Sequence, residues 1–382
     1  MTRIAFVVNG QPNSPMGERA RAFARRLQPR HEIRVFHRSP NKFRSIARMT
    51  FDLLRYRPRI CYVLDMGYSG VVSGFLFRCL TGQRLVIDTG DAIAELAKAL
   101  GRGRIGVALT AAIERFGFAV AQRIVVRGTY HAEWLRQRGI RADVIQDGVD
   151  VRQFASAPDG ELRRRLGLEG VLTVGLVGSS VWNPRAETCY GWDLVELVRL
   201  LRDRPVVGVM IGDGSGIAIL RERCRQYGIE DRIRFLGRIA YDELPAHLGV
   251  IDVCLSTQTN DLVGQVRTTG KLPLYLASGR YILASDVGEA SRVLAPEMLV
   301  DFVGSHDPNY PEKLAERVRR LLNDPEQLRR GQRLAHLSSE PFDYDVLAAR
   351  LESLIDDRVP SPTKAAILKV RSIGKVPAEQ RV

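Results

Sequence analysis

Short apolar runs rich in β-branched residues alternate with segments of helical length, and this series starts twice along the chain of 382 residues. The first series comprises residues 3–8, 32–37, 60–64, 84–87, 123–126 and 143–146. The second comprises residues 171–177, 206–211, 233–236, 250–255, 281–284 and 299–303. Strands that alternate with helices predict parallel sheets covered on both faces. We therefore expect an α/β protein with two Rossmann-like, doubly wound domains that face a cleft, with ligands at the carboxyl ends of the strands.

The restart of the series sets the expected domain limits. We expect a first domain over residues 1–160, a second over 171–340 and a polar linker between them. An amphipathic helix within 341–358 has Leu347, Leu351 and Leu354 on one face and should return to the first domain. The basic tail, 359–382, is weakly patterned, and we expect it to be flexible.

The net charge of +14 is unevenly distributed, since residues 1–60 hold 14 Lys and Arg against 3 Asp and Glu. This imbalance predicts that the first domain faces acidic lipid headgroups, phosphorylated lipid carriers or nucleic acid, with a solvated basic face as the alternative. The arginines lack interleaved aromatic partners, so no nucleic acid partner is expected. The basic amphipathic segment 42–57 suits an anionic membrane surface, or equally a cover for its own sheet.

The expected location follows from cysteines and hydropathy. Five scattered cysteines lie mostly in apolar runs, which indicates buried free thiols in a reducing compartment. We see no signal peptide, and no uncharged run reaches the ~18 residues of a membrane span. A cytoplasmic protein is expected, with peripheral contact to the inner face of the plasma membrane as an extension of that hypothesis.

The polar, glycine-spaced stretch 260–290 is the first candidate site. It carries Arg267 and Lys271 in a loop before a short helix, and Asp286 and Glu289 after the following strand. Two cations beside backbone amides at a helix start suit a phosphate-bearing ligand. The alternative is a loop packed between sheet and helix.

Two glycine-containing turns follow strands of the second series. The run 206–211 is followed by Gly212, Asp213 and Gly214, and then by a segment expected to be a helix. A glycine-containing turn between a strand and a helix is typical of a phosphate site. A dinucleotide fingerprint is the alternative, but the first strand of the chain lacks one. The run 171–177 leads into Gly178, Ser179 and Ser180, with Arg185 as a charge clamp if the loop closes.

No cofactor or catalytic metal is expected, because no His, Cys, Asp and Glu cluster has ligand spacing. Asp343-Tyr344-Asp345 resembles the Asp-x-Asp pattern of metal-dependent sugar transferases. Its place at the start of the last helix favours a capping role instead.

Taken in order, several motifs resemble family 4 retaining glycosyltransferases of the GT-B fold. They are Gln146-Asp-Gly-Val-Asp150, Val177-Gly178, Gly191-Trp-Asp-Leu194, Ile211-Gly-Asp-Gly214, Phe235-Leu-Gly-Arg238, Lys271-Leu-Pro-Leu-Tyr-Leu-Ala-Ser-Gly279 and Val287-Gly-Glu289. The resemblance implies that the second domain binds a nucleotide-sugar donor and the first binds a glycan or lipid-linked acceptor. It also implies metal-independent sugar transfer with retention, for instance in cell-envelope polysaccharide biosynthesis.

The chain departs from that family at the donor site. Val266 and Leu274 stand where two glutamates separated by seven residues are usual, and Cys189 and Tyr190 replace a cationic pair. An acidic residue, Asp91, stands near the position of the usual histidine. The resemblance then implies catalytic roles for Asp91, Arg267 and Lys271. It implies donor contacts from Gly178, Ser179, Ser180, Arg185, Gly212, Asp213, Gly214, Arg238, Asp286 and Glu289, and acceptor-side roles for Gly17 and Arg19.

Two other functions stay open because the glutamate pair is missing. One is a non-catalytic protein that binds nucleotide sugars on the same scaffold. The other is an isomerase of nucleotide sugars.

Overall fold

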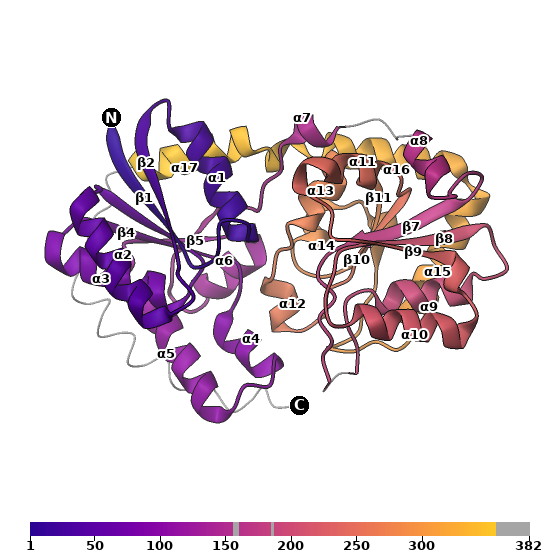
Figure 1. Cartoon of the computed structure of the whole chain (residues 1–382), viewed down its shortest axis with the longest axis horizontal. Helices are drawn as coiled ribbons and strands as arrows, with labels where there is room; N and C mark the ends of the chain where they lie inside the picture. Colours follow the sequence, from indigo (N-terminus) through magenta and orange to yellow (C-terminus); the bar gives the residue numbers. More distant parts are fainter. Residues whose placement is uncertain (156–159, 185–186, 357–382) are drawn as a thin grey trace. The chain divides into compact units, whose positions relative to one another are not determined.

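A computed structural model describes residues 1–155, 160–184 and 187–356 of the chain. The chain divides into two compact units (Figure 1). Unit 1 comprises Met1–Asp147, the short segment Val266–Thr268 and, of the described C-terminal part, residues 344–356. Unit 2 comprises Gly148–Gln265 and Thr269–Asp343. The tail expected at 359–382 lies outside the described residues.

Unit 1 is built on a six-stranded sheet in which every neighbouring pair is parallel, in the order β2-β1-β3-β4-β5-β6. Its strands are β1 (Thr2–Val8), β2 (His31–His37), β3 (Ile60–Leu64), β4 (Arg84–Thr89), β5 (Arg123–Val126) and β6 (Asp143–Val144). Its helices are α1 (Pro15–Leu27), α2 (Lys42–Tyr56), α3 (Tyr68–Thr81), α4 (Ile93–Ala99), α5 (Arg104–Val120), α6 (Thr129–Arg136) and α17 (Tyr344–Asp356).

Alternate residues of β1 supply two separate cores in unit 1, as the period of two in a strand requires. Ile4, Phe6 and Val8 belong to the core under α1 and α17. Ala5 and Val7 belong to the core on the other face, which α2, α3, α5 and α6 cover. The sheet is therefore buried on both faces, which explains why its strands read as continuous apolar runs.

The last described helix, α17, packs on α1 (Figure 1). Leu347, Leu351 and Ile355 are buried in the same core as Phe23 and Leu27 of α1. The expectation that the C-terminal helix returns to the first domain is thus confirmed.

Unit 2 repeats the design with a six-stranded parallel sheet in the order β12-β11-β10-β7-β8-β9. Its strands are β7 (Leu172–Val177), β8 (Val206–Ile211), β9 (Ile233–Gly237), β10 (Val253–Ser256), β11 (Tyr281–Ser285) and β12 (Leu299–Val300). Its α-helices are α7 (Val151–Phe154), α8 (Gly160–Arg165), α9 (Trp192–Leu200), α10 (Ile217–Tyr227), α11 (Leu244–Gly249), α12 (Leu262–Val266), α13 (Lys271–Ala277), α14 (Ala290–Val293), α15 (Tyr310–Asn323) and α16 (Pro325–Leu337). Short 3₁₀ turns are η1 (Glu230–Arg232), η2 (Tyr241–Glu243), η3 (Pro296–Met298) and η4 (Glu340–Phe342).

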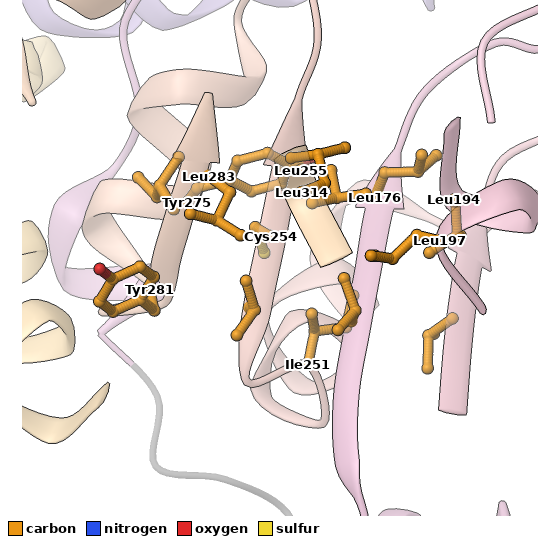
Figure 2. Packing of buried hydrophobic residues seen from close by; sticks show 14 of the residues in the cluster. Leu176, Leu194, Leu197, Ile251, Cys254, Leu255, Tyr275, Tyr281, Leu283 and Leu314 are labelled. Atoms are coloured by element: carbon orange, nitrogen blue, oxygen red, sulfur yellow. The ribbon is translucent and has the colours of Figure 1, made fainter. Parts of the chain in front are cut away.

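The core of unit 2 joins the strands to the helices on both faces. Figure 2 shows Leu176 of β7, Cys254 of β10 and Leu283 of β11 among side chains from α9, α13 and α15. Cys254 is fully buried, and burial raises the pKa of its thiol, so it is an inert core residue.

All of the runs expected as strands form strands, and the two-domain α/β fold is confirmed. Within each unit the loops that follow the strands lie at one edge of a parallel sheet, where ligands of such folds bind.

The hairpin of α4 and α5 holds one buried acid. Glu114 of α5 accepts a hydrogen bond from the backbone nitrogen of Ala94 at the start of α4 (3.4 Å). Burial raises the pKa of Glu114 to about 7, with Glu95 and Lys98 as the nearest charges. Because the pKa in the folded chain exceeds the ordinary 4.5, this stabilising contribution is complete below 4.5 and is lost as the pH rises through 7.

We therefore expect Glu114→Gln to remove this pH dependence. Between about pH 5 and about pH 8 the wild type should lose on the order of 2–3 kcal/mol of unfolding free energy relative to the variant. Thermal denaturation of both proteins at the two pH values measures this difference. If the stability difference between wild type and Glu114→Gln were the same at both pH values, the prediction would be contradicted.

Candidate functional site

The loops after β7 and β8 pack against each other through their backbones in unit 2. Ser180 N donates to the carbonyl of Asp213 (2.9 Å), and Gly216 N donates to the carbonyl of Ser180 (2.8 Å). A Cβ on Gly212 would lie 1.9 Å from the Gly178 carbonyl oxygen, and one on Gly214 would lie 2.2 Å from that of Ser180. Both glycines also have positive φ, +134° and +147°. Only glycine fits these two positions, because they combine a left-handed backbone with direct backbone contact.

Lys271 lies beside these loops, at the first residue of α13. Its ammonium Nζ is 3.4 Å from the centroid of the Tyr190 ring. Gly178 touches both residues, since a Cβ there would lie 3.0 Å from Lys271 Cε and 3.0 Å from Tyr190 Cε1. The ring face therefore holds a cation at the carboxyl end of β7.

The Tyr190 ring is itself fixed by the strand ends. Its hydroxyl donates to the carbonyl of Leu255 at the end of β10 (3.2 Å). Tyr275 of α13 accepts a hydrogen bond from Val177 N through its hydroxyl (2.8 Å). Burial raises the pKa of both phenols, so both are neutral. The seat of Lys271 is thus a rigid, uncharged surface.

The other donor candidates differ in exposure. Ser180 is fully buried, whereas Ser179, Asp213, Arg238 and Asp286 are exposed at the surface of unit 2. The side chain of Asp213 accepts a hydrogen bond from Gly214 N (2.7 Å). Arg185 lies outside the described residues.

Glu289 is buried and precedes α14. Next to it, Gly288 N donates to Gln265 Oε1 (2.9 Å), which ties the turn after β11 to the loop of α12. The turn and the loop of the stretch 260–290 are thus brought together. A role for Glu289 in orienting the donor stays a prediction.

The segment Val266–Thr268, which holds Arg267, belongs to unit 1, whereas Lys271 belongs to unit 2. Arg267 Nε donates to Asp91 Oδ1 at 2.8 Å, and Thr268 Oγ1 donates to Asp147 Oδ2 at 3.3 Å. The two candidate catalytic residues Asp91 and Arg267 are therefore an ion pair. In this structure each already compensates the charge of the other.

Arg19 belongs to a buried ionic network beneath the strand ends of unit 1. Its Nε and Nη2 donate to Asp88 Oδ2 at 3.1 and 3.0 Å, and its Nη1 and Nη2 donate to the carbonyls of Gln146 and Ile145. Arg127 Nε donates to Asp88 Oδ1 at 3.2 Å, and Tyr62 donates to Oδ2 at 2.9 Å. Burial alone would raise the pKa of Asp88, but Arg19 and Arg127 hold it below its ordinary value.

The two acceptor-side candidates thus have structural positions in α1. Arg19 is 1% exposed, so its guanidinium is occupied by protein acceptors. Gly17 is required by packing, since a Cβ would lie 2.1 Å from the carbonyl oxygen of Pro12. Direct acceptor contacts by either residue stay a prediction.

Sequence reasoning missed His131, in the first turn of α6. Its ring is fully buried, and neither ring nitrogen has a hydrogen-bond partner among the described residues. Burial lowers the pKa of His131 to about 4, and the charges of Asp91 and Arg127 also act on it. It is therefore a neutral imidazole. The sequence offered no signal for it, since a lone histidine in an amphipathic helix is usually a core or surface residue.

Asp343 and Asp345 act within the protein. Asp343 Oδ2 accepts from Val151 N at 3.1 Å, and Asp345 pairs with Arg26 of α1. Elsewhere in the described residues, His31, Glu352 and Asp356 have ligand atoms within 4.8 Å of one another. Glu352 is already paired there with Arg30 (2.7 Å) and His31 (3.0 Å). None of the helices that the structure describes is both long and apolar enough to cross a bilayer.

Comparison with solved structures identifies the fold class. Anabaena HepE in complex with UDP-glucose aligns with a TM-score of 0.73 at 16% identity, over 93% of this chain and 99% of that chain. The two parallel six-stranded sheets and this likeness are those of the GT-B fold.

Comparison of sequences places a family match inside unit 2. Residues 173–324 match the family described as Glycosyl transferases group 1. A 2-deoxystreptamine glucosyltransferase of Streptomyces kanamyceticus is 29% identical over 193 residues, 48% of this chain and 46% of the relative. A GDP-mannose-dependent alpha-(1-6)-phosphatidylinositol monomannoside mannosyltransferase of Mycobacterium tuberculosis is 27% identical over 221 residues, 56% of this chain and 55% of the relative. The chain thus spans about half the length of the curated relatives it matches.

Proposed function

We propose that this protein is a glycosyltransferase that moves a sugar from a nucleotide-sugar donor to a glycan or lipid-linked acceptor. We propose further that transfer is metal-independent, retains the anomeric configuration and serves cell-envelope polysaccharide biosynthesis. The observation that carries the proposal is the ammonium of Lys271 held on the Tyr190 ring beside Gly178. The family match over residues 173–324 and the two relatives support the same class of reaction.

The proposed role of Lys271 is electrostatic. When the bond between the anomeric carbon and the diphosphate oxygen breaks, negative charge grows on the leaving diphosphate. A cation held in advance stabilises that charge without reorganising during the reaction. The backbone of the Gly178 and Gly212–Gly214 turns would approach the phosphates closely, because these positions lack side chains.

Tyr190 and Lys271 together account for the missing family cation in this proposal. Tyr190 stands where the resemblance places a lysine, and its ring carries a lysine that comes from α13 instead. The positive charge is then retained at the same turn although its origin in the sequence has changed. In unit 1, we propose that Asp91, paired with Arg267, positions the acceptor hydroxyl.

Peripheral contact with an anionic membrane is part of the proposal. On α2, Phe43 and Phe51 are 85% and 64% exposed, and the exposed Arg44, Arg48 and Arg55 lie on the same helix. Exposed aromatic and basic residues on one amphipathic helix favour an anionic lipid surface.

The proposal is tested by two linked measurements. UDP-, GDP- and ADP-sugars are first screened for thermal stabilisation, because a ligand bound only by the folded state raises the melting temperature. The stabilising donor is then incubated with glycan and lipid-linked acceptors, and the anomeric configuration of any product is determined by NMR. Binding without turnover would favour a nucleotide-sugar-binding protein, and a new nucleotide sugar formed from donor alone would favour an isomerase.

Tyr190 variants test how Lys271 is held. We expect Tyr190→Leu to lower kcat/KM for the donor about threefold to thirtyfold, because a cation–π contact contributes about 0.5–2 kcal/mol. Tyr190→Phe is the matched control, since it keeps the ring and loses only the hydroxyl, with its contacts to the Leu255 carbonyl and the Tyr275 side chain, so its activity should stay near that of the wild type. Equal activity of the leucine and phenylalanine variants would show that the ring does not position the cation.

A further inference from the structure

Unit 1 has a pocket of about 260 Å³ at the carboxyl edge of its sheet. Its lining residues come from the loops that follow β1, β2, β3 and β4, from the start of α3 and from the hairpin of α4 and α5. The polar residues that line it are Asn9, Arg38, Asp65, Tyr68, Ser69, Asp91, Arg102 and Thr110. The residues that line this pocket belong to unit 1, whereas the turns that hold Lys271 belong to unit 2.

The strand order gives the pocket a charge gradient. Arg38 follows β2, Asn9 follows β1, Asp65 follows β3 and Asp91 follows β4. Since these strands lie in the order β2-β1-β3-β4, a cation stands at one end of the pocket and two carboxylates at the other. A ligand that fills it should therefore carry negative charge at one end and neutral hydrogen-bonding groups at the other.

The negative charges of Asp65 and Asp91 are already compensated by arginines of the protein. Asp91 is paired with Arg267 at 2.8 Å, and Asp65 lies 3.7 Å from Arg127. Asp65 has a positive φ of +73°, and its carbonyl accepts a hydrogen bond from Asn9 Nδ2 (2.5 Å). Carboxylates that are held and neutralised in this way suit ligand hydroxyls, as acceptors of hydrogen bonds.

The charges of the two arginines that line the pocket are not compensated within the described residues. Neither Arg38 nor Arg102 forms an ion pair with any residue that the structure describes, and Arg38 Nε is buried without a hydrogen-bond partner there. A buried guanidinium donor without an acceptor is costly. Arginine pairs in fork geometry with phosphate, which would satisfy this donor.

The hairpin of α4 and α5 carries apolar residues in the pocket lining and other apolar residues that are exposed. Leu96, Ala97 and Leu100 of the hairpin line the pocket, and Leu100 is 60% exposed. Ile105 and Leu109, at the start of α5, are 78% and 56% exposed. Exposed apolar residues on a hairpin that also lines a polar pocket favour a ligand with a hydrocarbon part.

We propose that this pocket binds the acceptor as a phosphorylated lipid. The phosphate lies between Arg38 and Arg102, and the hydrocarbon chain leaves over Leu100, Ile105 and Leu109. Hydroxyl groups of the head, where present, face Asn9 and Asp65. That the bound lipid is the acceptor rests on the proposed function. Binding of a phosphorylated lipid in this pocket can be tested whether or not the protein transfers sugar.

Titration calorimetry on the full chain separates the contributions. The probes are inorganic phosphate, farnesyl phosphate as a short lipid phosphate, and farnesol as its uncharged counterpart. We expect farnesyl phosphate to bind at least about tenfold more tightly than either of the others, because charge-assisted hydrogen bonds contribute about 1.5–3 kcal/mol. Equal binding of inorganic phosphate would overturn the lipid assignment, and equal binding of farnesol would overturn the phosphate assignment.

Variants locate the site. Arg38→Gln and Arg102→Gln should each weaken farnesyl phosphate at least about tenfold. Arg25→Gln removes the same charge from an exposed position of α1 outside the pocket and should have no effect. Ile105→Ser should weaken farnesyl phosphate but not inorganic phosphate. Arg102 is exposed, so its variant will fold even if Arg38→Gln does not. Unchanged affinity in Arg102→Gln would overturn the proposal.

Vesicle flotation distinguishes the pocket from general attraction to a membrane. Vesicles of phosphatidylcholine with phosphatidylglycerol should bind wild type and Arg38→Gln alike, because α2 is unchanged, while only the wild type binds farnesyl phosphate tightly. If Arg38→Gln abolishes flotation as well, the pocket is not a separate site and the proposal fails. Failure of the proposed function would appear differently, as absence of donor binding or transfer in a protein that still binds farnesyl phosphate.

Discussion

Replacing Lys271 with alanine is expected to lower the turnover of sugar transfer about 10²- to 10³-fold, the range seen when one preorganised electrostatic group is removed from a transition state. The reason lies in its position, 3.4 Å above the Tyr190 ring and in contact with Gly178 at the end of β7. No solvent has to be reorganised around a cation that is already held there. The measurement is steady-state kinetics with the donor that stabilises the protein best.

The control for Lys271→Ala is Lys313→Ala in the same unit. Lys313 of α15 pairs with Asp301 and Asp307, which precede that helix, so the charge change is equal while turnover should stay unchanged. Lys271→Arg should retain part of the activity, because the charge persists but the shape of the head differs. Full activity in Lys271→Ala would remove this residue from the mechanism.

The second large effect is on stability. Asp88→Asn should lower the free energy of unfolding by about 3–5 kcal/mol, because it removes the buried carboxylate that both guanidinium groups bind directly. Asp147, 3.6 Å from Arg19 and 3.7 Å from Arg127, then remains as their shared acidic partner. Asp88 is fully buried and accepts from Arg19, Arg127 and Tyr62. Urea denaturation monitored by circular dichroism measures the loss.

The contribution of Asp88 to the free energy of unfolding should decrease at acidic pH. The pKa of Asp88 in the folded chain is below its ordinary value of 3.8, so the carboxylate stabilises the fold fully above 3.8. This contribution is lost as the pH falls from 3.8 through the folded-state pKa, whereas Asp88→Asn should lack this part of the acid transition. Glu32→Gln, which breaks an exposed pair with Arg3, should change stability by less than about 1 kcal/mol. A similarly small effect of Asp88→Asn would contradict the account of the network.

The fold could be predicted from the sequence because its signal is periodic and local. The runs at 3–8 and 206–211, for example, are β-branched, short and followed by turn residues, and they became β1 and β8. A sheet buried on both faces needs such runs, since Ile4 and Ala5 on opposite faces must both be apolar. The restart of the series at about 171 likewise reflects a second, independent core.

The site could be predicted only in part, since side-chain partners are set by distant segments. Arg19 reads as an exposed cation of an amphipathic helix, yet its partner Asp88 lies 69 residues away. The contact between Lys271 and Tyr190 joins α13 to the loop before α9, and no periodic pattern encodes it. The ion pair of Arg267 with Asp91 spans 176 residues. Residue types and turns were therefore recognisable, whereas their pairing required the structure.

The central claim is that Lys271 faces the diphosphate of a bound nucleotide. It is tested most directly by a thermodynamic double-mutant cycle, in which one change is Lys271→Ala and the other is the removal of one phosphate from the ligand. The affinities of the nucleoside diphosphate and monophosphate of the preferred base are measured for both proteins by calorimetry. We predict that the diphosphate binds the wild type at least about tenfold more tightly than the monophosphate, and that Lys271→Ala loses most of this preference. The same preference in both proteins would contradict the account.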